Sequence, residues 1–351
     1  MRNLYITTYL ASYRSDLYEA LFKTLSCEVF YYEEAEIPLG SDLTFCPRRL
    51  PVRRLLGRPM VKGLVPILKQ YRPEYVFVQE FSLTTLWLLG LRRKFGFKLI
   101  SFCDDSLDMI SGNDFRRLHT LARRFLPRLL DNLILHSPEV CQWYRCRFSK
   151  GIVLPIVADN TRYRKRLEEC LPASRLLRDE QGVGNRRIVL FVGRLVALKN
   201  IPLLLDAFRR MGQDDVTLVI VGDGECRQVW ESQSCGLDVR FTGMLDEKGV
   251  LAWYNLADLL VLPSYREAFG AVVGEALLAG CPVLVSGKAG ARSLIRPGIN
   301  GDVFQDRSVD ELTRLMQKWL SAVHPGRELI LRDNLLDVSF QECFRKMKES
   351  I

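Results

Sequence analysis

The feature that most constrains the fold is an alternation of short apolar runs with longer amphipathic segments. Residues 75–79 (YVFVQ) and 98–102 (KLISF) are typical of these runs, and a helical pattern over 82–95 separates them. Strands of four to six residues that alternate with helices of ten or more predict βα units, because each helix carries the chain back to the same end of a parallel sheet. We therefore predict an α/β protein.

The alternation occurs twice, which predicts two domains. At 351 residues the chain is long enough for two domains of ordinary size. We expect both to be doubly wound and Rossmann-like, facing a cleft that holds the substrate, because ligands bind beyond the carboxyl ends of parallel strands. The predicted segments are a first domain at 1–165, a linker at 166–186, a second domain at 187–335 and a C-terminal helix at about 336–351, for which packing back on the first domain is one option.

The composition is that of a globular protein, with 48% hydrophobic and 26% charged residues. No run of 18 apolar residues occurs, and the N-terminus lacks the apolar core of a secretory signal, so we expect a cytoplasmic protein. Ten cysteines are scattered without a Cys-x-x-Cys pair, and there are three histidines. This pattern argues against a zinc site or a disulfide framework.

The positive charge is confined to the first half of the chain. Residues 1–180 carry 29 Lys and Arg against 20 Asp and Glu, whereas the remaining residues carry 21 of each. Such an excess favours an anionic partner, namely a membrane face or a phosphorylated lipid, although a solvated basic surface is the simpler alternative. Nucleic acid is the weaker candidate, because no nucleic-acid-binding motif accompanies the charge. The clusters lie at 48–62, 92–94, 116–128 and 162–166.

The stretch 263–286 (PSYREAFGAVVGEALLAGCPVLVS) indicates a strand end, a loop, a helix and a second strand. Glu267 falls in the loop and Glu275 in the helix. The first N–H groups of such a helix are unpaired and attract anions, and carboxylates accept hydrogen bonds from hydroxyls. This combination suits a sugar phosphate, although two solvated surface acids would give the same spacing.

A second group of candidate residues follows the strand predicted at 187–192. Gly193 lets the backbone turn, and Arg194 and Lys199 lie on the loop before the next helix, at the same sheet edge as Glu267. Two cations near a helix N-terminus would hold a diphosphate, unless they are ordinary surface bases. Neither a P-loop nor a Gly-x-Ser-x-Gly nucleophile elbow occurs in the sequence.

Together these residues resemble the retaining nucleotide-sugar glycosyltransferases of the GT-B fold, known as glycosyltransferase family 4. The resemblance covers about residues 187–305 and includes the segments FVGRLVALKNIPLLLDAF, LVIVGDGE, VRFTGMLD and GINGDVF. It implies that Glu267 contacts donor-sugar hydroxyls and supports the developing positive charge, and that Glu275 holds the ribose. It also implies that no metal or separate cofactor is needed. The implied diphosphate site comprises Arg194, Lys199 and the backbone N–H groups of Phe269, Gly270, Ala271 and Val272.

The first half of the chain departs from the family pattern at two places. Where the family has a glycine-rich loop after the first strand, this chain has Ala11-Ser12-Tyr13-Arg14, and we place Tyr13 and Arg14 on the acceptor side. Where the family has a histidine, this chain has Cys103-Asp104-Asp105. Asp104 is the candidate catalytic replacement, although a structural acid is an equal alternative. His136, just past a strand, does not occupy the family position.

The resemblance predicts a transferase that moves a sugar from a nucleotide diphospho-sugar to a glycan or polyprenyl-linked acceptor with retention. Cell-surface polysaccharide biosynthesis is the expected context, with the protein held peripherally on the inner face of the membrane. A non-catalytic sugar-nucleotide-binding subunit is the main alternative. A GT-B-fold epimerase is the third hypothesis, and it would convert the donor without any acceptor.

Overall fold

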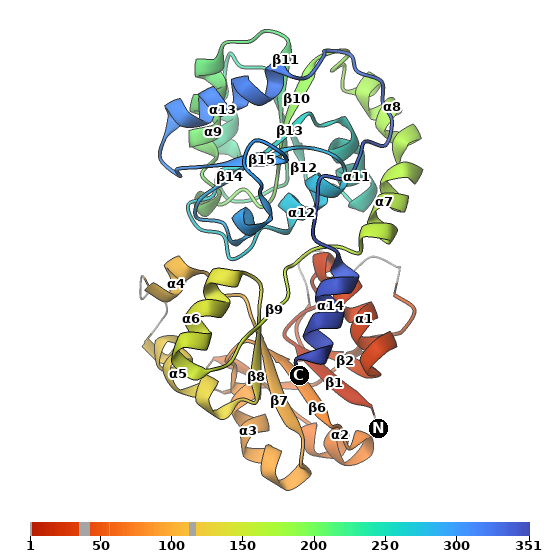
Figure 1. Cartoon of the computed structure of the whole chain (residues 1–351), viewed down its shortest axis with the longest axis vertical. Helices are drawn as coiled ribbons and strands as arrows, with labels where there is room; N and C mark the ends of the chain where they lie inside the picture. Colours follow the sequence, from red (N-terminus) through yellow and green to blue (C-terminus); the bar gives the residue numbers. More distant parts are fainter. Residues whose placement is uncertain (1, 35–42, 56, 112–116) are drawn as a thin grey trace. The chain divides into compact units, whose positions relative to one another are not determined.

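The structure is a computed structural model that describes residues 2–34, 43–55, 57–111 and 117–351. It divides into two compact units. Unit 1 comprises Met1–Ile156 together with Gln341–Ile351, and unit 2 comprises Val157–Phe340. Each unit is a parallel sheet with helices packed on it (Figure 1), so the predicted α/β class is confirmed.

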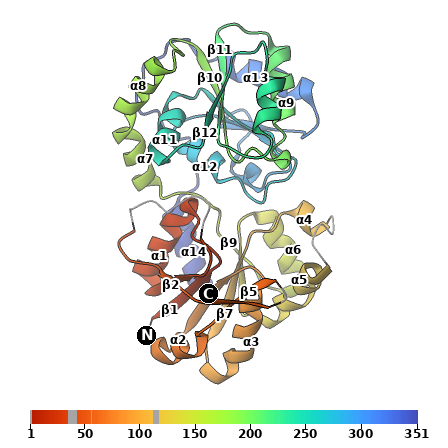
Figure 2. The same cartoon turned by 180° about the vertical axis from the view of Figure 1, so that it is seen from behind.

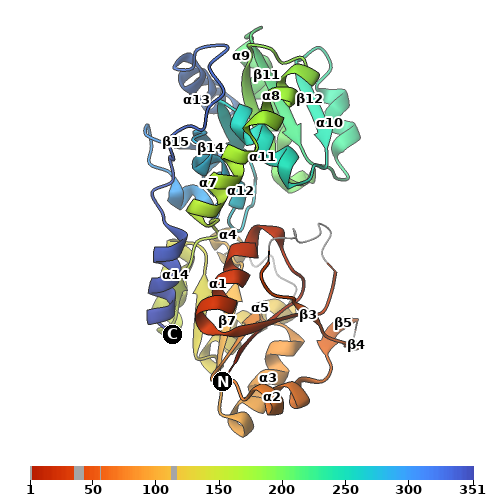
Figure 3. The same cartoon turned by 90° about the vertical axis from the view of Figure 1, so that its right-hand side faces the viewer.

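Unit 1 contains, among the described residues, a seven-stranded sheet in the order β3-β2-β1-β6-β7-β8-β9. All neighbouring strands in it run parallel. The antiparallel hairpin β4–β5 is separate from this sheet and lies at the margin of the unit in Figure 3. The strands are β1 (Asn3–Thr7), β2 (Cys27–Tyr31), β3 (Arg48–Arg49), β4 (Val52–Leu55), β5 (Arg58–Val61), β6 (Tyr75–Gln79), β7 (Lys98–Cys103), β8 (Asn132–Leu135) and β9 (Ile152–Val153).

The helices of unit 1 follow the strands as the alternation predicts. The N-terminus of α3 is fixed by Ser82, whose hydroxyl accepts a hydrogen bond from the Thr85 N–H while the Thr85 hydroxyl accepts one from the Ser82 N–H. The helices are α1 (Ser15–Leu25), α2 (Leu64–Tyr71), α3 (Leu83–Phe95), α4 (Leu107–Ser111), α5 (Arg117–Leu129), α6 (Pro138–Phe148) and α14 (Phe340–Glu349), of which α14 begins at the last residue of unit 2.

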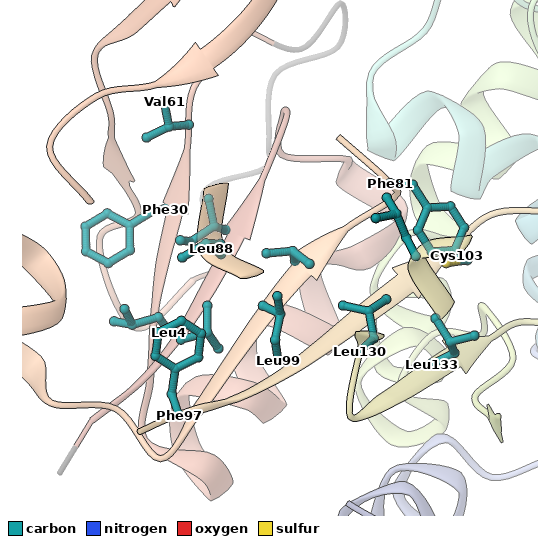
Figure 4. Close-up of a cluster of buried hydrophobic side chains, with 14 of the residues drawn as sticks. Leu4, Phe30, Val61, Phe81, Leu88, Phe97, Leu99, Cys103, Leu130 and Leu133 are labelled. Atoms are coloured by element: carbon teal, nitrogen blue, oxygen red, sulfur yellow. The ribbon is translucent and has the colours of Figure 1, made fainter. Parts of the chain in front are cut away.

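The central strands of unit 1 are mostly apolar and buried, because both faces of the sheet are covered. On one face Leu4 of β1, Leu99 of β7 and Leu133 of β8 belong to a common cluster, as Figure 4 shows. On the other face Tyr5 meets Tyr18 of α1, with their ring centroids 5.7 Å apart. Each such fully buried side chain contributes about 1.5–3 kcal/mol relative to exposure, which holds the strand ends in fixed positions.

Unit 2 contains a second parallel sheet in the order β12-β11-β10-β13-β14-β15 (Figure 2). Its strands are β10 (Arg187–Val192), β11 (Val216–Val221), β12 (Val239–Gly243), β13 (Leu259–Leu262), β14 (Val283–Ser286) and β15 (Gly301–Phe304). Its helices are α7 (Asn160–Glu169), α8 (Leu171–Glu180), α9 (Ile201–Met211), α10 (Arg227–Gln233), α11 (Glu247–Leu256), α12 (Ala271–Leu278) and α13 (Val309–Ser321).

The strand order of unit 2 reverses between β10 and β13, which are hydrogen-bonded neighbours. In open parallel sheets, ligands bind beyond the carboxyl ends of the strands at such a switch point, where the loops that follow the two strands begin. The loops at 193–200 and 263–270 both contain predicted site residues. The topology therefore brings the two sets of predicted donor-binding residues to one place.

The segment predicted as a linker, 166–186, is instead largely helical and belongs to unit 2. It lies in α7, α8 and the turn that follows them. Leu167 is fully buried, and the side-chain amide of Asn255 in α11 donates hydrogen bonds to the Leu167 carbonyl (2.9 Å) and the Ser174 hydroxyl (3.2 Å). The many charges of this segment lie on the outer side of two amphipathic helices. The apolar inner side fixes them to unit 2.

No helix in the described part of the chain has both the length and the apolar character needed to cross a bilayer.

Candidate functional site

Asn200 joins the two loops at the switch point of unit 2. It is buried, and its side-chain amide donates hydrogen bonds to the carbonyl oxygens of Pro263 and Asp306, both at 3.1 Å. The Tyr265 N–H adds a backbone hydrogen bond to the Leu198 carbonyl at 2.9 Å. These bonds hold the loop after β10 against the loop after β13, so the side chains on the two loops are positioned together.

Lys199 and Glu267 form an ion pair across these loops. The Lys199 ammonium donates to Oε2 of Glu267, and the two side chains are 18% and 17% exposed. The backbone of Glu267 is held by the Gly290 N–H, which donates to its carbonyl at 3.2 Å. The Glu267 backbone is therefore held in place, while both side chains of the ion pair remain partly exposed to solvent. An ammonium in this setting has further donors for a phosphate oxygen.

Helix α12 begins four residues after Glu267, at Ala271. Gly270 precedes the helix with φ +98°, in the left-handed region that glycine tolerates, and Phe269 is buried beneath it. Ala271 and Val272 form the first turn and are half-buried. The first N–H groups of the helix therefore lie at the carboxyl edge of the sheet, where they favour an anion.

Glu275 has a different partner from Glu267. It lies in the second turn of α12, and its Oε2 accepts a hydrogen bond from the Tyr254 hydroxyl of α11 at 2.7 Å. Burial raises the pKa of the Glu275 carboxyl above its ordinary value. Arg194, the remaining predicted donor-site cation, follows Gly193 on the loop after β10 and has an exposed side chain.

Unit 1 contains a second polar cluster, centred on Asp104, which follows β7. Its Oδ1 accepts a hydrogen bond from the Arg14 guanidinium and lies 2.5 Å from Nε2 of His136. Its Oδ2 accepts a hydrogen bond from the Gln79 amide at 3.1 Å. Arg14 follows β1, Gln79 ends β6 and His136 follows β8. Four neighbouring parallel strands thus deliver these side chains to one edge of the sheet.

The charges in this cluster hold Asp104 ionised. Burial opposes ionisation, but Arg14 and His136 hold the pKa of Asp104 well below its usual range. Nδ1 of His136 donates a hydrogen bond to the Leu154 carbonyl at 2.9 Å, and this contact fixes the ring. Asp104 remains 24% exposed, whereas Arg14 is only 2% exposed. One side of the carboxylate is therefore reachable.

A second layer of contacts supports this cluster from beneath. Asp105 is fully buried and accepts hydrogen bonds from Nε of Arg123 at 2.8 Å and from the Tyr144 hydroxyl at 2.6 Å. The Glu80 carboxylate accepts a hydrogen bond from the Asp104 N–H at 2.7 Å. The backbone of Glu80 has φ +62°, which is uncommon for a residue other than glycine. Burial and the carboxylates of Asp105 and Asp104 raise the pKa of Glu80. Uncommon backbone conformations and carboxylates placed close together are both more frequent at functional sites than elsewhere.

The sequence analysis missed His136 as a member of this cluster. Its signal was available, because His136 and Ser137 directly follow a buried strand just as Asp104 follows β7. The predicted acceptor-side residues also differ from each other. Tyr13 is exposed, whereas Arg14 is buried with its guanidinium carbon 5.7 Å from the Tyr13 ring centroid. Among the described residues Nε and Nη1 of Arg14 have no hydrogen-bond partner.

A solved structure of similar architecture identifies the fold. The Anabaena protein HepE, solved in complex with UDP, aligns with 100% of this chain and 99% of its own, with a TM-score of 0.76 and 17% identity. This likeness establishes the architecture. The chain has the GT-B fold.

Sequence similarity to known glycosyltransferases is concentrated in unit 2. Residues 174–329 match the family described as glycosyl transferases group 1. An uncharacterized glycosyltransferase of Methanocaldococcus jannaschii is 33% identical over 144 residues, which cover 38% of this chain and only 37% of that protein. An alpha-D-kanosaminyltransferase of Streptomyces kanamyceticus is 24% identical over 344 residues, which cover 81% of this chain and 82% of that protein. The segment 174–329 is therefore similar to the glycosyl transferases group 1 family.

We predict that Gly222→Ala will damage unit 2 at the switch point. Gly222 has φ +133°, and a Cβ there would lie 2.0 Å from the carbonyl oxygen of Gly193, so the backbone of the loop after β10 would have to move. A loss of about 3 kcal/mol or more in the free energy of unfolding is expected, measured by denaturant titration.

Gly236→Ala is the matched control for this substitution. Gly236 has φ +79°, but a Cβ added there would meet nothing within 4 Å, so only the backbone cost of about 1–2 kcal/mol applies. Equal losses of stability in the two variants would contradict the close approach of Gly222 to the Gly193 carbonyl.

Proposed function

We propose that this protein is a retaining glycosyltransferase that moves a sugar from a nucleotide diphospho-sugar to an acceptor hydroxyl. The observation that carries the proposal is the Lys199–Glu267 ion pair beside the N-terminus of α12. It combines a cation and helix N–H groups for a diphosphate with a carboxylate for sugar hydroxyls. HepE, which has the same fold, has been solved with UDP and with UDP-glucose, and this supports a nucleotide-sugar donor here.

The donor would bind to unit 2. Lys199, Arg194 and the first N–H groups of α12 would hold the diphosphate, and Glu275 would accept hydrogen bonds from the ribose. Glu267 would bind sugar hydroxyls, and its negative charge would stabilise the positive charge that develops at the anomeric carbon. Each interaction that strengthens as charge develops is typically worth a few kcal/mol in the transition state.

The reaction would exchange one bond at the anomeric carbon for another. The bond from this carbon to the phosphate oxygen breaks, and the nucleoside diphosphate leaves with the electron pair. The acceptor oxygen bonds to the same face of the carbon, and its proton passes to the departing phosphate oxygen. Lys199 and Arg194 would lower the barrier by stabilising the negative charge on the leaving diphosphate, and no metal or separate cofactor is proposed.

Asp104 is the proposed catalytic residue of unit 1, where it would accept a hydrogen bond from the sugar or the acceptor. The neighbouring charges favour its ionised form, and its partly exposed side leaves room for a ligand. His136 and Arg14 would be positioning residues, because both hold the same carboxylate oxygen. Tyr13, which is exposed beside this cluster, would contact the acceptor.

The acceptor would be a glycan or a polyprenyl-linked glycan in cell-surface polysaccharide synthesis, reached at the cytoplasmic face of the membrane. The excess of positive charge in residues 1–180 supports a negatively charged carrier. Synthesis on such a carrier would require an earlier transferase to load its first sugar.

The donor can be identified by thermal denaturation in the presence of nucleoside diphosphates. The matching diphosphate at about 100 times its dissociation constant would stabilise the protein by roughly 2.7 kcal/mol, which corresponds to about 5–10 °C for a domain of this size. We expect one of UDP, GDP or ADP to give this shift and the others much smaller ones. No shift with any diphosphate would contradict the proposed donor site.

We predict that Lys199→Ala and Glu267→Ala each lower kcat by about 100-fold or more, because each removes a charge that acts in the transition state. Transfer to acceptor and release of nucleoside diphosphate would be measured together. Lys165→Ala, at a lysine of α7 whose side chain is 75% exposed, is the matched control and should retain wild-type activity. Wild-type rates in both site variants would refute the assignment, and diphosphate release without acceptor would indicate a different activity.

Substitutions of His136 test its positioning role. A Gln amide reaches the place of Nε2, which contacts Asp104, whereas an Asn amide reaches only the place of Nδ1, which contacts the Leu154 carbonyl. We therefore expect His136→Gln to retain about tenfold more kcat than His136→Asn, with the donor KM little changed in both.

The unfolding temperatures of the two His136 variants are the control for a purely structural role. If Gln and Asn give the same kcat at similar unfolding temperatures, contact with Asp104 is not what His136 contributes.

A further inference from the structure

Helix α5 exposes a stripe of large apolar side chains. Leu121 is 51% exposed, Phe125 54% and Leu129 54%. Residues four apart in a helix lie on one face, so these three side chains form a continuous line along α5. Isolated exposed apolar residues are ordinary on a protein surface, but a line of three along one helix is not.

The opposite face of α5 explains why this orientation is fixed. Leu126 is buried in the core of unit 1, and Arg123 is buried in its ion pair with Asp105. Rotating the helix to bury Leu121 and Phe125 would break that ion pair and leave Asp105 charged in the interior, which is very costly. The outward stripe is therefore not available to the core.

Positive charge surrounds the stripe. Arg124 and Arg128 are exposed on the same side of α5, and neither is in an ion pair with another described residue. Residues 117–130 contain no acidic residue. Asp131, the next acid along the chain, is already engaged by the Leu99 N–H at 2.7 Å and by Arg92 at 3.1 Å.

The basic and aromatic character continues onto α6, which lies beside α5 (Figures 1 and 2). The Arg128 guanidinium lies 5.1 Å from the ring centroid of Phe148, and Arg147 lies 3.9 Å from that of Trp143. The Lys150 ammonium joins the two helices through the carbonyls of Pro127 and Arg128, both at 3.1 Å. We define the α5–α6 surface as Leu121, Arg124, Phe125, Arg128, Leu129 and Arg147.

We propose that the α5–α6 surface docks on an anionic lipid bilayer. A helix parallel to a membrane inserts its Leu and Phe side chains at the boundary of the acyl chains while Arg side chains extend to the phosphates. In this arrangement both the apolar side chains and the arginines of the surface contact the bilayer. A second copy of this chain would cover the apolar stripe but would bring like charges together, and a nucleic acid would leave the three apolar side chains without a partner.

This inference deepens the proposed function, on which it rests for the membrane-side acceptor, by naming the contact surface. It also distinguishes two contributions to binding. The arginines would act through charge and be screened by salt, whereas the apolar stripe would act through burial and resist salt. Of the occupants considered, only an anionic bilayer would use both the arginine charges and the apolar stripe.

The experiment is co-sedimentation of the full chain with phosphatidylcholine vesicles that contain about one third phosphatidylglycerol. Arg124→Gln with Arg128→Gln should weaken binding about 30-fold at low salt, which corresponds to about fivefold per arginine. Leu121→Ser with Phe125→Ser should weaken it at least tenfold, and the remaining binding should vanish at high salt. Wild-type binding should fall with salt without disappearing.

The matched control is Arg53→Gln with Arg54→Gln, which removes the same charge from the exposed strand β4. It should leave binding within about threefold of wild type, and all variants should keep the wild-type unfolding temperature because the changed side chains are exposed. Equal losses in this control would overturn the proposal, since binding would then follow total charge. So would wild-type binding by both α5 variants, or equal binding to pure phosphatidylcholine.

Sedimentation velocity without lipid tests the alternative occupant. A dimer that the Leu121 and Phe125 substitutions dissociate would assign the surface to a second copy and overturn the proposal. Lipid binding is measured without donor or acceptor, so it can fail while sugar transfer succeeds, or the reverse. The two proposals are therefore refuted by separate results.

Discussion

Parallel strand pairing is the constraint on which both polar clusters depend. In each sheet every strand ends at the same edge, so residues far apart in the chain meet when they follow neighbouring strands. Lys199 and Glu267 are 68 residues apart and form an ion pair because β10 and β13 are neighbours. Arg14 and His136 are 122 residues apart and meet at Asp104 because β1, β6, β7 and β8 lie side by side.

The two clusters differ in how their charges are satisfied. In unit 2 the Lys199–Glu267 pair is partly exposed, so a diphosphate and sugar hydroxyls could replace the internal contact at small cost in solvation. In unit 1 Arg14 and Asp105 are buried and paired with Asp104 and Arg123 respectively, and removal of one member of a pair would leave an uncompensated charge. The first arrangement suits exchange of ligands, and the second suits a rigid support for one partly exposed carboxylate.

The sequence was sufficient for what depends on local pattern. The βα alternation predicted two parallel-sheet units, and the position of Lys199 and Glu267 after strands predicted that they share an edge. The prediction of a linker at 166–186 was wrong, because a count of charges does not show that Leu167 and Ser174 are buried against α11. Helical periodicity in that segment was the signal that charge obscured.

Strand order was the information that the sequence could not supply. Asp104 was identified by its place after β7, but its partner His136 follows β8, and only the sheet shows that these two ends are adjacent. The burial of Arg14 is non-local in the same way. A position after β1 indicates an exposed loop residue, whereas the neighbouring strands bring a carboxylate to it that makes burial of the guanidinium tolerable.

Helix α5 connects the buried network of unit 1 with its surface. Arg123 on the inner face holds Asp105 and lies 3.2 Å from the carboxylate of Glu80, so the network requires that face to point inward. The orientation then commits Leu121, Phe125 and Leu129 to the outside. An acidic residue on the outer face would improve solubility through pairing with Arg124 or Arg128, yet this helix has none. Stability of the isolated chain explains the inner face but gives no reason for the composition of the outer one, whereas contact with an anionic apolar boundary accounts for both its arginines and its apolar stripe.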